Sequence, residues 1–278
     1  MVDLTKVRVT VCIPHVMREN LLRKCLQSLN ENVSLPYRVI IINSGRRLSF
    51  QDEEILVVND PERKGIGAKR QLFAELVKTE YMFFLDNDMI VYPGSLEAQI
   101  RALDENLQLA AVSGLCFQKG KFHSTIADFK FIGDKVVKQT YSFEEILASK
   151  RDLFEADFIP IGHTTFRMKA VKDIAFDPNY EIGYEHWDTF MQLYYTDWKC
   201  AVHKKSWFSH LQHESPREYL RIRNKASRIE KSRKYFIEKW GYHPSIAFET
   251  KRKKGAMLKV LSYMLWLSKR FLKSIHAM

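Results

Sequence analysis

Residues 81–92 constrain the fold of this chain most, because they read Tyr-Met-Phe-Phe-Leu-Asp-Asn-Asp-Met-Ile-Val-Tyr. An apolar run that ends in polar residues is typical of a buried strand. Asp86 and Asp88 follow that run directly, and open α/β sheets bind their ligands at the carboxyl ends of strands. Two neighbouring carboxylates repel unless a cation joins them, and their oxygens suit Mg²⁺ or Mn²⁺, which in turn bind phosphates. The competing interpretation is an acidic turn in which Asp88 only caps the next element.

Strands and helices alternate along the first part of the chain. Apolar and β-branched runs predict the strands, and leucines at helical spacing predict the helices. Such alternation indicates a parallel sheet with right-handed crossovers, which is the α/β class. The expected strands are 7–13, 37–42, 55–58, 81–85 and 109–116, and the expected helices are 20–30, 67–78 and 95–103.

The second part of the chain is less regular. Residues 158–168 predict a strand, a loop and a second strand, and residues 184–195 predict a helix. Residues 200–202 predict a short strand, and residues 215–240 predict one long basic helix. Residues 117–150 follow no clear period, so no element is assigned to them.

The composition, with 46% hydrophobic and 28% charged residues over 278 positions, is that of an ordinary globular protein. This length suffices for one large domain or two small ones. The cysteines are far apart and form no Cys-x-x-Cys pair, which argues against a disulfide framework or zinc site and favours a reducing compartment. We find no secretory signal and no run apolar enough to span a bilayer, so we expect a cytoplasmic protein.

The net charge of +11 is concentrated between Arg217 and Lys273. A basic surface of this kind attracts nucleic acid, anionic lipid or phosphorylated substrates, or is simply the solvated face of a helix. From 257 to 275 the cations share one helical arc while the leucines lie elsewhere, next to the basic run 251–254. This pattern predicts a helix on a membrane surface, in preference to a terminal helix packed on the protein core.

A glycine-containing segment, Gly65-Ile-Gly67-Ala-Lys-Arg70-Gln71, precedes and enters a predicted helix. Glycines let backbone amides approach a phosphate, and a helix N-terminus favours an anion. Arg70 can add a bidentate contact to a diphosphate or to a base edge. The alternative is a flexible turn with Arg70 in solvent.

Two later segments carry groups for acid–base or metal chemistry. Glu185 and Asp188 lie three residues apart, so a helix presents them on one face, where either can act as a general base. They can equally complement a helix dipole, with His186 packed against a neighbouring tryptophan. His210 and His213 follow a strand-like run, and neutral imidazole is a good ligand for Mn²⁺.

Taken in order, these segments resemble the family 2 glycosyltransferases, which have a GT-A fold: a mixed, mostly parallel sheet flanked by helices. The resemblance covers about residues 7–241 and rests on the ordered set of motifs. The motifs are Ile13-Pro14, Arg18 and the leucine-rich helix, Gly65 to Gln71, Phe84-Leu85-Asp86-Asn87-Asp88 with Pro93-Gly94, Phe176-Asp177, Glu185 to Asp188, His210 and Lys239-Trp240-Gly241.

The resemblance implies inverting transfer of a sugar from a nucleotide diphosphate sugar to a hydroxyl acceptor, with Mn²⁺ or Mg²⁺ as cofactor. Asp86 and Asp88 would hold the metal together with His210 or His213. The base would be Asp188, Glu185 or His186, of which we favour Asp188. Contacts to the donor would come from Pro14, Arg18, Asn43, Gly65, Gly67, Arg70, Asp86 and Asn87.

Two departures from the family pattern bear on this expectation. Asn43 stands where the family usually has an aspartate that contacts the nucleotide base, which leaves the base open. His186 stands at the usual position of the catalytic carboxylate, which leaves the general base open.

The expected division is a GT-A domain over 1–250 and a basic amphipathic helix over 251–278. Within the domain, the nucleotide-sugar half covers about 1–116, the acceptor half about 117–215 and the basic helix about 215–241. The resemblance further implies glycan or cell-surface polysaccharide synthesis on a glycan or lipid-linked acceptor at the cytoplasmic face of a membrane.

Two other functions compete with this expectation. A nucleic-acid-binding module would use the basic helix 217–240, but it leaves the acids after the strand unexplained. A sugar nucleotidyltransferase would carry its glycine-rich loop after the first strand, where this chain has Pro14-His15-Val16.

Overall fold

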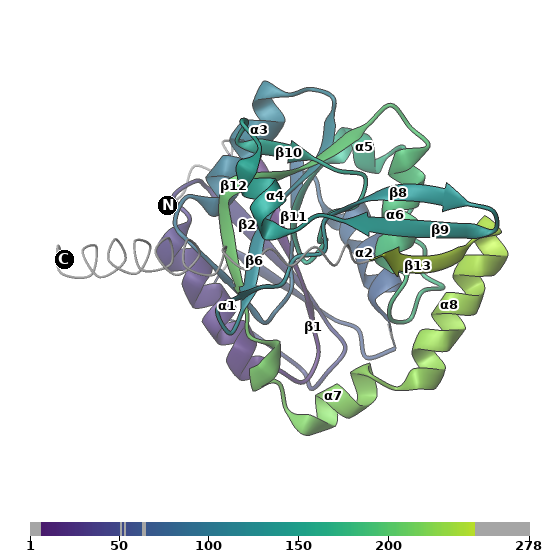
Figure 1. The fold of residues 1–278 in the computed structure, drawn as a ribbon. Helices are drawn as coiled ribbons and strands as arrows, with labels where there is room; N and C mark the ends of the chain where they lie inside the picture. The colour runs from purple at the N-terminus through teal and green to yellow at the C-terminus, as the bar shows by residue number, and fades with distance from the viewer. Residues whose placement is uncertain (1–6, 51, 53, 63–64, 248–278) are drawn as a thin grey trace.

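The computed structural model describes residues 7–247 apart from 51, 53, 63 and 64, and shows a central sheet with helices on both faces (Figure 1). The strands are β1 Val9–His15, β2 Tyr37–Asn43, β3 Ile55–Asn59, β4 Tyr81–Leu85, β5 Met89–Val91, β6 Leu109–Gln118, β7 Lys121–Phe122, β8 Ala127–Ile132, β9 Lys135–Thr140, β10 Leu153–Glu155, β11 His163–Arg167, β12 Lys199–His210 and β13 His243–Ala247. The helices are α1 Glu19–Asn32, α2 Ile66–Leu76, α3 Ser95–Glu105, α4 Phe143–Ala148, α5 Met168–Val171, α6 Glu185–Tyr194, the 3₁₀ helix η2 Gln212–Glu214, α7 Arg217–Arg223 and α8 Ala226–Trp240.

The central sheet is mixed and has the strand order β10-β12-β6-β11-β4-β1-β2-β3. Strands β4, β1, β2 and β3 run parallel, whereas β11 runs antiparallel between β4 and β6. Because β11 runs opposite to β4, the residues that enter β11 lie beside the end of β4, where Asp86 N donates to Gly162 O at 2.8 Å. The expected α/β architecture is confirmed, and the reversed strand adds a second chain segment to the site.

Helices cover the sheet on both faces. Helices α1 and α3 bury Leu22 and Leu103 against one face, and α2 and α6 bury Phe73 and Phe190 against the other. Every residue of β4 is buried, as expected for a central strand with both faces covered. Each fully buried apolar side chain of this size contributes about 1.5–3 kcal/mol. The packing therefore fixes the end of β4, from which the site is built.

A small second sheet, in the order β13-β9-β8, lies beside α6 and α8 (Figure 1). Its strands β8 and β9 occupy part of the region 117–150 in which no element was assigned. The hairpin buries Lys138, whose ammonium lies 3.0 Å from the Phe158 ring centroid and 3.7 Å from that of Trp187. A lysine at an inward position of a strand conceals the alternation on which a strand prediction depends.

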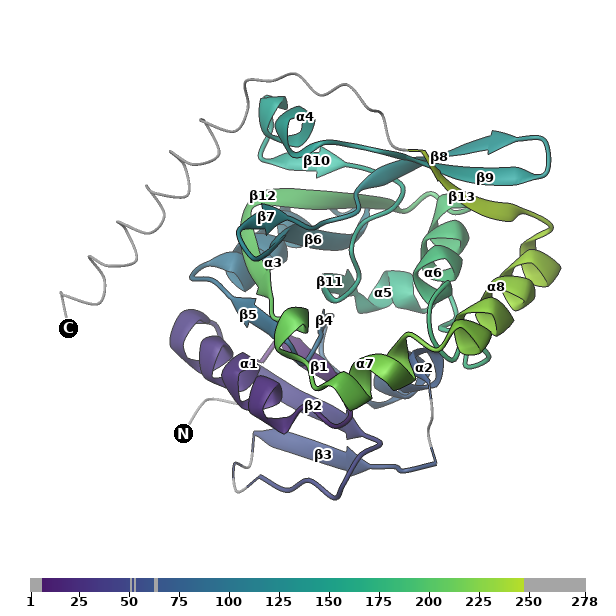
Figure 2. The same cartoon turned by 60° about the horizontal axis from the view of Figure 1, so that its bottom comes forward.

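The predicted single helix over 215–240 is wrong, because the chain forms α7 and α8 with a break between them. Asn224 ends α7, and Lys225 is extended with φ −63° and ψ 110°. Figure 2 shows α7 and α8 passing along one side of the molecule, from the end of β12 near α1 to α6. The break lets Phe236 of α8 enter the core while α7 reaches Arg18.

The predicted amphipathic helix over 251–278 lies outside the described residues. Within residues 7–247, with the gaps already given, no helix is long and apolar enough to cross a membrane.

Candidate active site

Polar side chains from segments far apart in the sequence gather in two clusters where β4 ends. The Asp88 cluster consists of Arg18, Asn87, Asp88 and His210. The Arg70 cluster consists of Arg70, Glu185 and His186, and Asp86 lies beside it.

Asp88 is the buried centre of the first cluster, with 2% of its surface exposed. Arg18 donates from Nη1 to Asp88 Oδ2 and from Nη2 to Asn87 Oδ1. His210 Nε2 lies 3.2 Å from the same Asp88 oxygen. Burial alone would raise the pKa of Asp88, but the contacts with His210 and Arg18 outweigh it and lower that pKa below its ordinary value. The carboxylate is therefore charged and held by Arg18 and His210.

The length of β12 brings His210 to Asp88. The sequence predicted a strand only over 200–202, but β12 continues past an irregularity between Val202 and Trp207 and pairs with β5. In that pairing His210 is opposite Met89, and Leu211 N donates to Asp88 O at 2.7 Å. The backbone thus fixes the imidazole beside the carboxylate.

His15 and Lys69 belong to the surroundings of this cluster and were missed from the sequence. His15 Nδ1 lies 2.7 Å from Asn87 Nδ2, and Lys69 Nζ donates to the His15 carbonyl at 2.9 Å. Burial lowers the pKa of Lys69 to about 8. His15 ends β1 at the same sheet edge as Asn87, beside the residue Pro14 predicted to contact the donor, and that position was the signal that could have identified it.

Arg70 is the buried centre of the second cluster, with 3% of its surface exposed. Its Nη1 lies 3.3 Å from Glu185 Oε1, and its Nη2 lies 3.1 Å from His186 Nε2. His186 Nε2 is also 2.9 Å from Glu185 Oε1, so this nitrogen either donates to Glu185 or accepts from Arg70, according to the tautomer. Burial opposes the charge on Glu185, but His186 and Arg70 outweigh it and lower its pKa to about 2.

Asp86 lies between the strand end and the Arg70 cluster. Arg70 and His186 both interact electrostatically with its carboxylate. A Cβ atom at position 162 would come within 2.3 Å of Asp86 Oδ2, so the carboxylate lies against Gly162. A side chain at position 162 would therefore displace the Asp86 carboxylate.

Asp188 occupies a different environment from the other candidate bases. Its Oδ1 accepts from Tyr180 Oη at 3.2 Å and Trp240 Nε1 at 2.8 Å, and it pairs with Lys239 Nζ at 2.8 Å. Its Oδ2 accepts from Gln192 Nε2 at 2.8 Å. A carboxylate engaged by these donors ties α6 to α8, so the geometry does not support our preference for Asp188 as the base.

The glycines of the segment 65–71 allow its backbone to pack closely against the backbone of residues 177–181. Gly65 has φ +107°, and a Cβ at Gly67 would lie 2.1 Å from the Asp177 carbonyl oxygen. The first amides of α2 donate to the carbonyls of Tyr180 and Glu181. Because these amides already have partners, the phosphate contact predicted for this helix N-terminus finds no support, and Arg70 is the group that the segment brings to the site.

Asn43 also makes its contacts within the protein. Its Nδ2 donates to Arg46 O at 2.7 Å and Asn59 Oδ1 at 2.8 Å, and its Oδ1 accepts from Gly45 N at 2.9 Å. These bonds close the turn after β2 and join it to β3.

Asp88 and His210 fit a divalent cation better than His213 does. Their facing atoms are 3.2 Å apart, close to the roughly 3 Å between neighbouring ligands of an octahedral ion with bonds of about 2.1 Å. His210 Nδ1 is buried and has no hydrogen-bond partner among the described residues. His213 is exposed on η2, 4.0 Å from Glu214. In the part of the chain that the structure describes, no three His, Cys, Asp or Glu side chains form a complete metal site.

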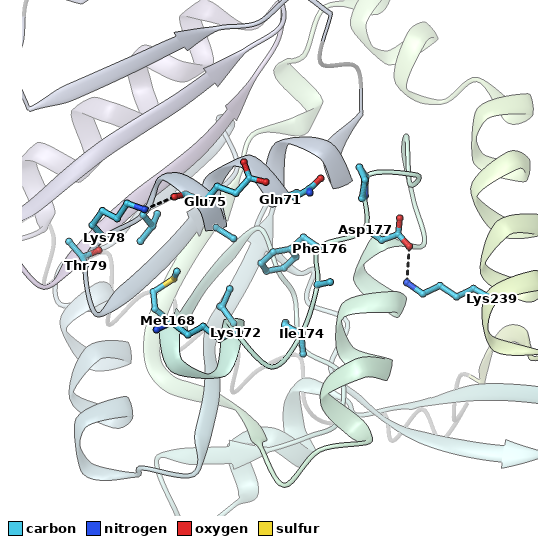
Figure 3. Close-up of a pocket in the computed structure, with 15 residues that line it drawn as sticks. Gln71, Glu75, Lys78, Thr79, Met168, Lys172, Ile174, Phe176, Asp177 and Lys239 are labelled. Carbon is cyan, nitrogen blue, oxygen red and sulfur yellow. Dashed lines mark hydrogen bonds and ion pairs between the residues drawn. The ribbon is translucent and has the colours of Figure 1, made fainter.

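A hollow of about 660 Å³ lies elsewhere, between α2 and the segment that runs from Met168 to Asp177 (Figure 3). Phe176 and Ile174 form apolar walls, and the ion pair between Asp177 and Lys239 lies at one end. Neither cluster contributes a residue to its lining.

Comparison with known proteins identifies the family. A family model described as Glycosyl transferase family 2 matches residues 10–174, more than half of the chain. The chain belongs to glycosyl transferase family 2. The match contains Arg18, Arg70 and Asp86 to Asp88, whereas Glu185 and His210 lie beyond it. Family membership also favours sugar transfer over a nucleic-acid module or a nucleotidyltransferase.

Three proteins similar to this family 2 chain share 12–19% sequence identity with it. An uncharacterized glycosyltransferase of Haemophilus influenzae is 19% identical over 179 residues, which are 60% of this chain and 60% of that protein. The structure of GalNAc-T7 with UDP, GalNAc and Mn²⁺ has a TM-score of 0.59 and 12% identity, covering 75% of this chain and 44% of that one. S. aureus TarS 1-349 has a TM-score of 0.52 and 15% identity, covering 90% and 77%. At these identities the structures show the fold alone, and they confirm the GT-A expectation.

Proposed function

We propose that this chain is a metal-dependent, inverting glycosyltransferase that moves a sugar from a nucleotide diphosphate sugar to a hydroxyl group. The observation that carries the proposal is the meeting of the Arg70 and Asp88 clusters at the carboxyl end of β4. The Arg70 cluster offers groups that can accept a proton, Glu185 and His186. The Asp88 cluster offers a carboxylate beside the imidazole of His210, which together suit a cation. Single-displacement transfer needs both, because one proton must leave the acceptor while a diphosphate departs.

Stabilisation of the leaving diphosphate is assigned to the buried arginines. Arg70 and Arg18 are 3% and 8% exposed, so their charges act in a region from which water is largely excluded. Guanidinium groups suit phosphate oxygens because they donate two parallel hydrogen bonds. Asp88 and His210, with Asp86 nearby, would hold the divalent cation, which when bound supplies further positive charge to the diphosphate.

Removal of the acceptor proton is assigned to His186, oriented by Glu185. With its Nε2 proton donated to Glu185 Oε1, His186 keeps the lone pair on Nδ1. The His186 imidazole is 38% exposed while Glu185 is buried, so the imidazole is the accessible member of the pair. Partial desolvation of the imidazole and the nearby charge of Arg70 lower the pKa of His186 although Glu185 opposes the shift, so His186 can accept a proton at neutral pH.

The wider setting follows from the resemblance and is proposed with it. The nucleotide half would extend to about residue 116 and the acceptor half to about 215. The acceptor would be a glycan or a lipid-linked molecule at the cytoplasmic face of a membrane, and the product a glycan or polysaccharide.

A thermal-shift screen tests the proposal directly. UDP, GDP, ADP, CDP and TDP are compared with and without Mn²⁺, beginning with the UDP and Mn²⁺ present in the similar GalNAc-T7 structure. We expect one diphosphate to stabilise the fold by about 2.7 kcal/mol at a hundred times its dissociation constant, and to do so better with metal. No shift with any diphosphate would contradict the proposal.

A further inference from the structure

Arg18 occupies the place beside Asp88 where a metal cation would bind. Its guanidinium bridges Asp88 Oδ2 and Asn87 Oδ1, lies 4.1 Å from the Tyr219 ring centroid and approaches Ser215 Oγ at 3.3 Å. Both members of the ion pair are almost fully buried, at 8% and 2% exposure. The chain thus neutralises its own candidate metal ligand.

Arg18 and a divalent cation cannot both bind Asp88 Oδ2 closely. Asp88 Oδ2 is the atom that faces His210 Nε2 at 3.2 Å, and it is also the atom that Arg18 contacts. A divalent ion bound to that oxygen would repel the guanidinium at close range in a buried site, where screening by water is weak. Metal binding therefore requires Arg18 to move away from Asp88.

A nucleotide diphosphate provides the alternative partner that Arg18 needs. Diphosphate oxygens accept bidentate hydrogen bonds from guanidinium, and they carry more charge than one carboxylate. Arg18 Nε is buried without a hydrogen-bond partner among the described residues, so the side chain still has an N–H group to donate.

We propose that Arg18 keeps Asp88 closed to divalent cations until a nucleotide diphosphate binds and draws the arginine away. The inference rests on the proposed function, and it makes metal and nucleotide binding strongly cooperative. Because such coupling is reciprocal, each ligand tightens the other by the same factor.

The test measures Mn²⁺ affinity, by the electron paramagnetic resonance signal of free Mn²⁺ and by calorimetry, in wild type, Arg18→Gln and Arg23→Gln. Arg23 is the matched control because it lies in α1, which Arg18 precedes, is exposed and pairs with Glu19 at the surface. Without nucleotide, we expect Arg18→Gln to bind Mn²⁺ at least tenfold more tightly than wild type, about 1.4 kcal/mol. Arg23→Gln should match wild type, and UDP should tighten Mn²⁺ binding more in wild type than in Arg18→Gln.

Equal Mn²⁺ affinities of nucleotide-free wild type and Arg18→Gln would overturn the inference while leaving the proposed function intact. If Arg18→Gln does not fold, the test uses Tyr219→Leu instead. This variant removes the ring beneath the Arg18 guanidinium and keeps the Arg18–Asp88 ion pair. That variant should gain about threefold in Mn²⁺ affinity, and an unchanged affinity would refute the inference. Failure of every variant to bind Mn²⁺, both alone and with each of UDP, GDP, ADP, CDP and TDP, would overturn both the metal role in the proposed function and this inference.

Discussion

Asp88 and Asp188 are both buried aspartates of the candidate site, yet their surroundings differ in kind. Asp88 contacts Arg18 and His210, which are themselves groups suited to phosphate and metal chemistry. Asp188 contacts Tyr180, Gln192, Trp240 and Lys239, which join α6 to its neighbours. Burial alone therefore does not separate the aspartate proposed to bind a cation from the one that joins helices, whereas the identity of their partners does.

The largest expected effect is the loss of activity in Asp88→Asn. Asparagine keeps the size of the side chain and one acceptor for Arg18, but removes the charge that would bind the cation. We expect transfer to fall by roughly 10³-fold or more while the fold is retained. Transfer rates with a cooperative thermal melt check this, and unchanged turnover would exclude the proposed role of Asp88.

The Arg70 cluster allows the next comparison, between His186→Gln and Glu185→Gln. Loss of the general base should reduce transfer by about 10²–10⁴-fold in His186→Gln. In wild type, activity should be flat near neutral pH and fall only below the lowered pKa of His186, where the imidazole gains a proton. Glu185 raises the pKa of His186, so Glu185→Gln should move this acid limb to lower pH. If the acid limb of the pH profile lies at the same pH in Glu185→Gln and wild type, Glu185 does not orient and tune His186.

Asp188→Asn should show the opposite pattern, in which stability falls and activity is kept. The new NH₂ group would replace either the oxygen that accepts from Gln192 or the oxygen that accepts from Tyr180 and Trp240. At least one of these donors would lose its partner, which lowers the free energy of unfolding by about 1–3 kcal/mol. Urea unfolding measures the loss, and transfer per folded molecule should stay within about threefold of wild type. A fall in activity as large as that of Asp88→Asn would end the distinction between the two aspartates.

The smallest effect is expected for Trp240→Phe. This change removes the Nε1 donor to Asp188 while keeping most of the aromatic surface, and it should cost about 1 kcal/mol. Nucleotide affinity, measured by calorimetry, should not change in this variant. A loss of affinity would show that the hydrogen bonds of Asp188 influence nucleotide binding.

The sequence predicted the components of the site better than their arrangement. The strand 81–85 and its acids were found because the apolar run and the charges are adjacent in the chain. The role of Asp188 was not predictable, because Trp240 and Lys239 lie about fifty residues away and their approach depends on the packing of α8. The glycines at 65 and 67 were assigned to phosphate binding, but sequence alone does not show that the segment 177–181 packs against them.

The most direct test of the account is calorimetric titration of the Mn²⁺–nucleotide diphosphate complex into wild type, Asp88→Asn and Asp188→Asn under identical conditions. The account predicts that Asp88→Asn weakens binding by about 100-fold or more, while Asp188→Asn stays within about threefold of wild type. Equal binding by Asp88→Asn and wild type, or an equal loss in both variants, would contradict it.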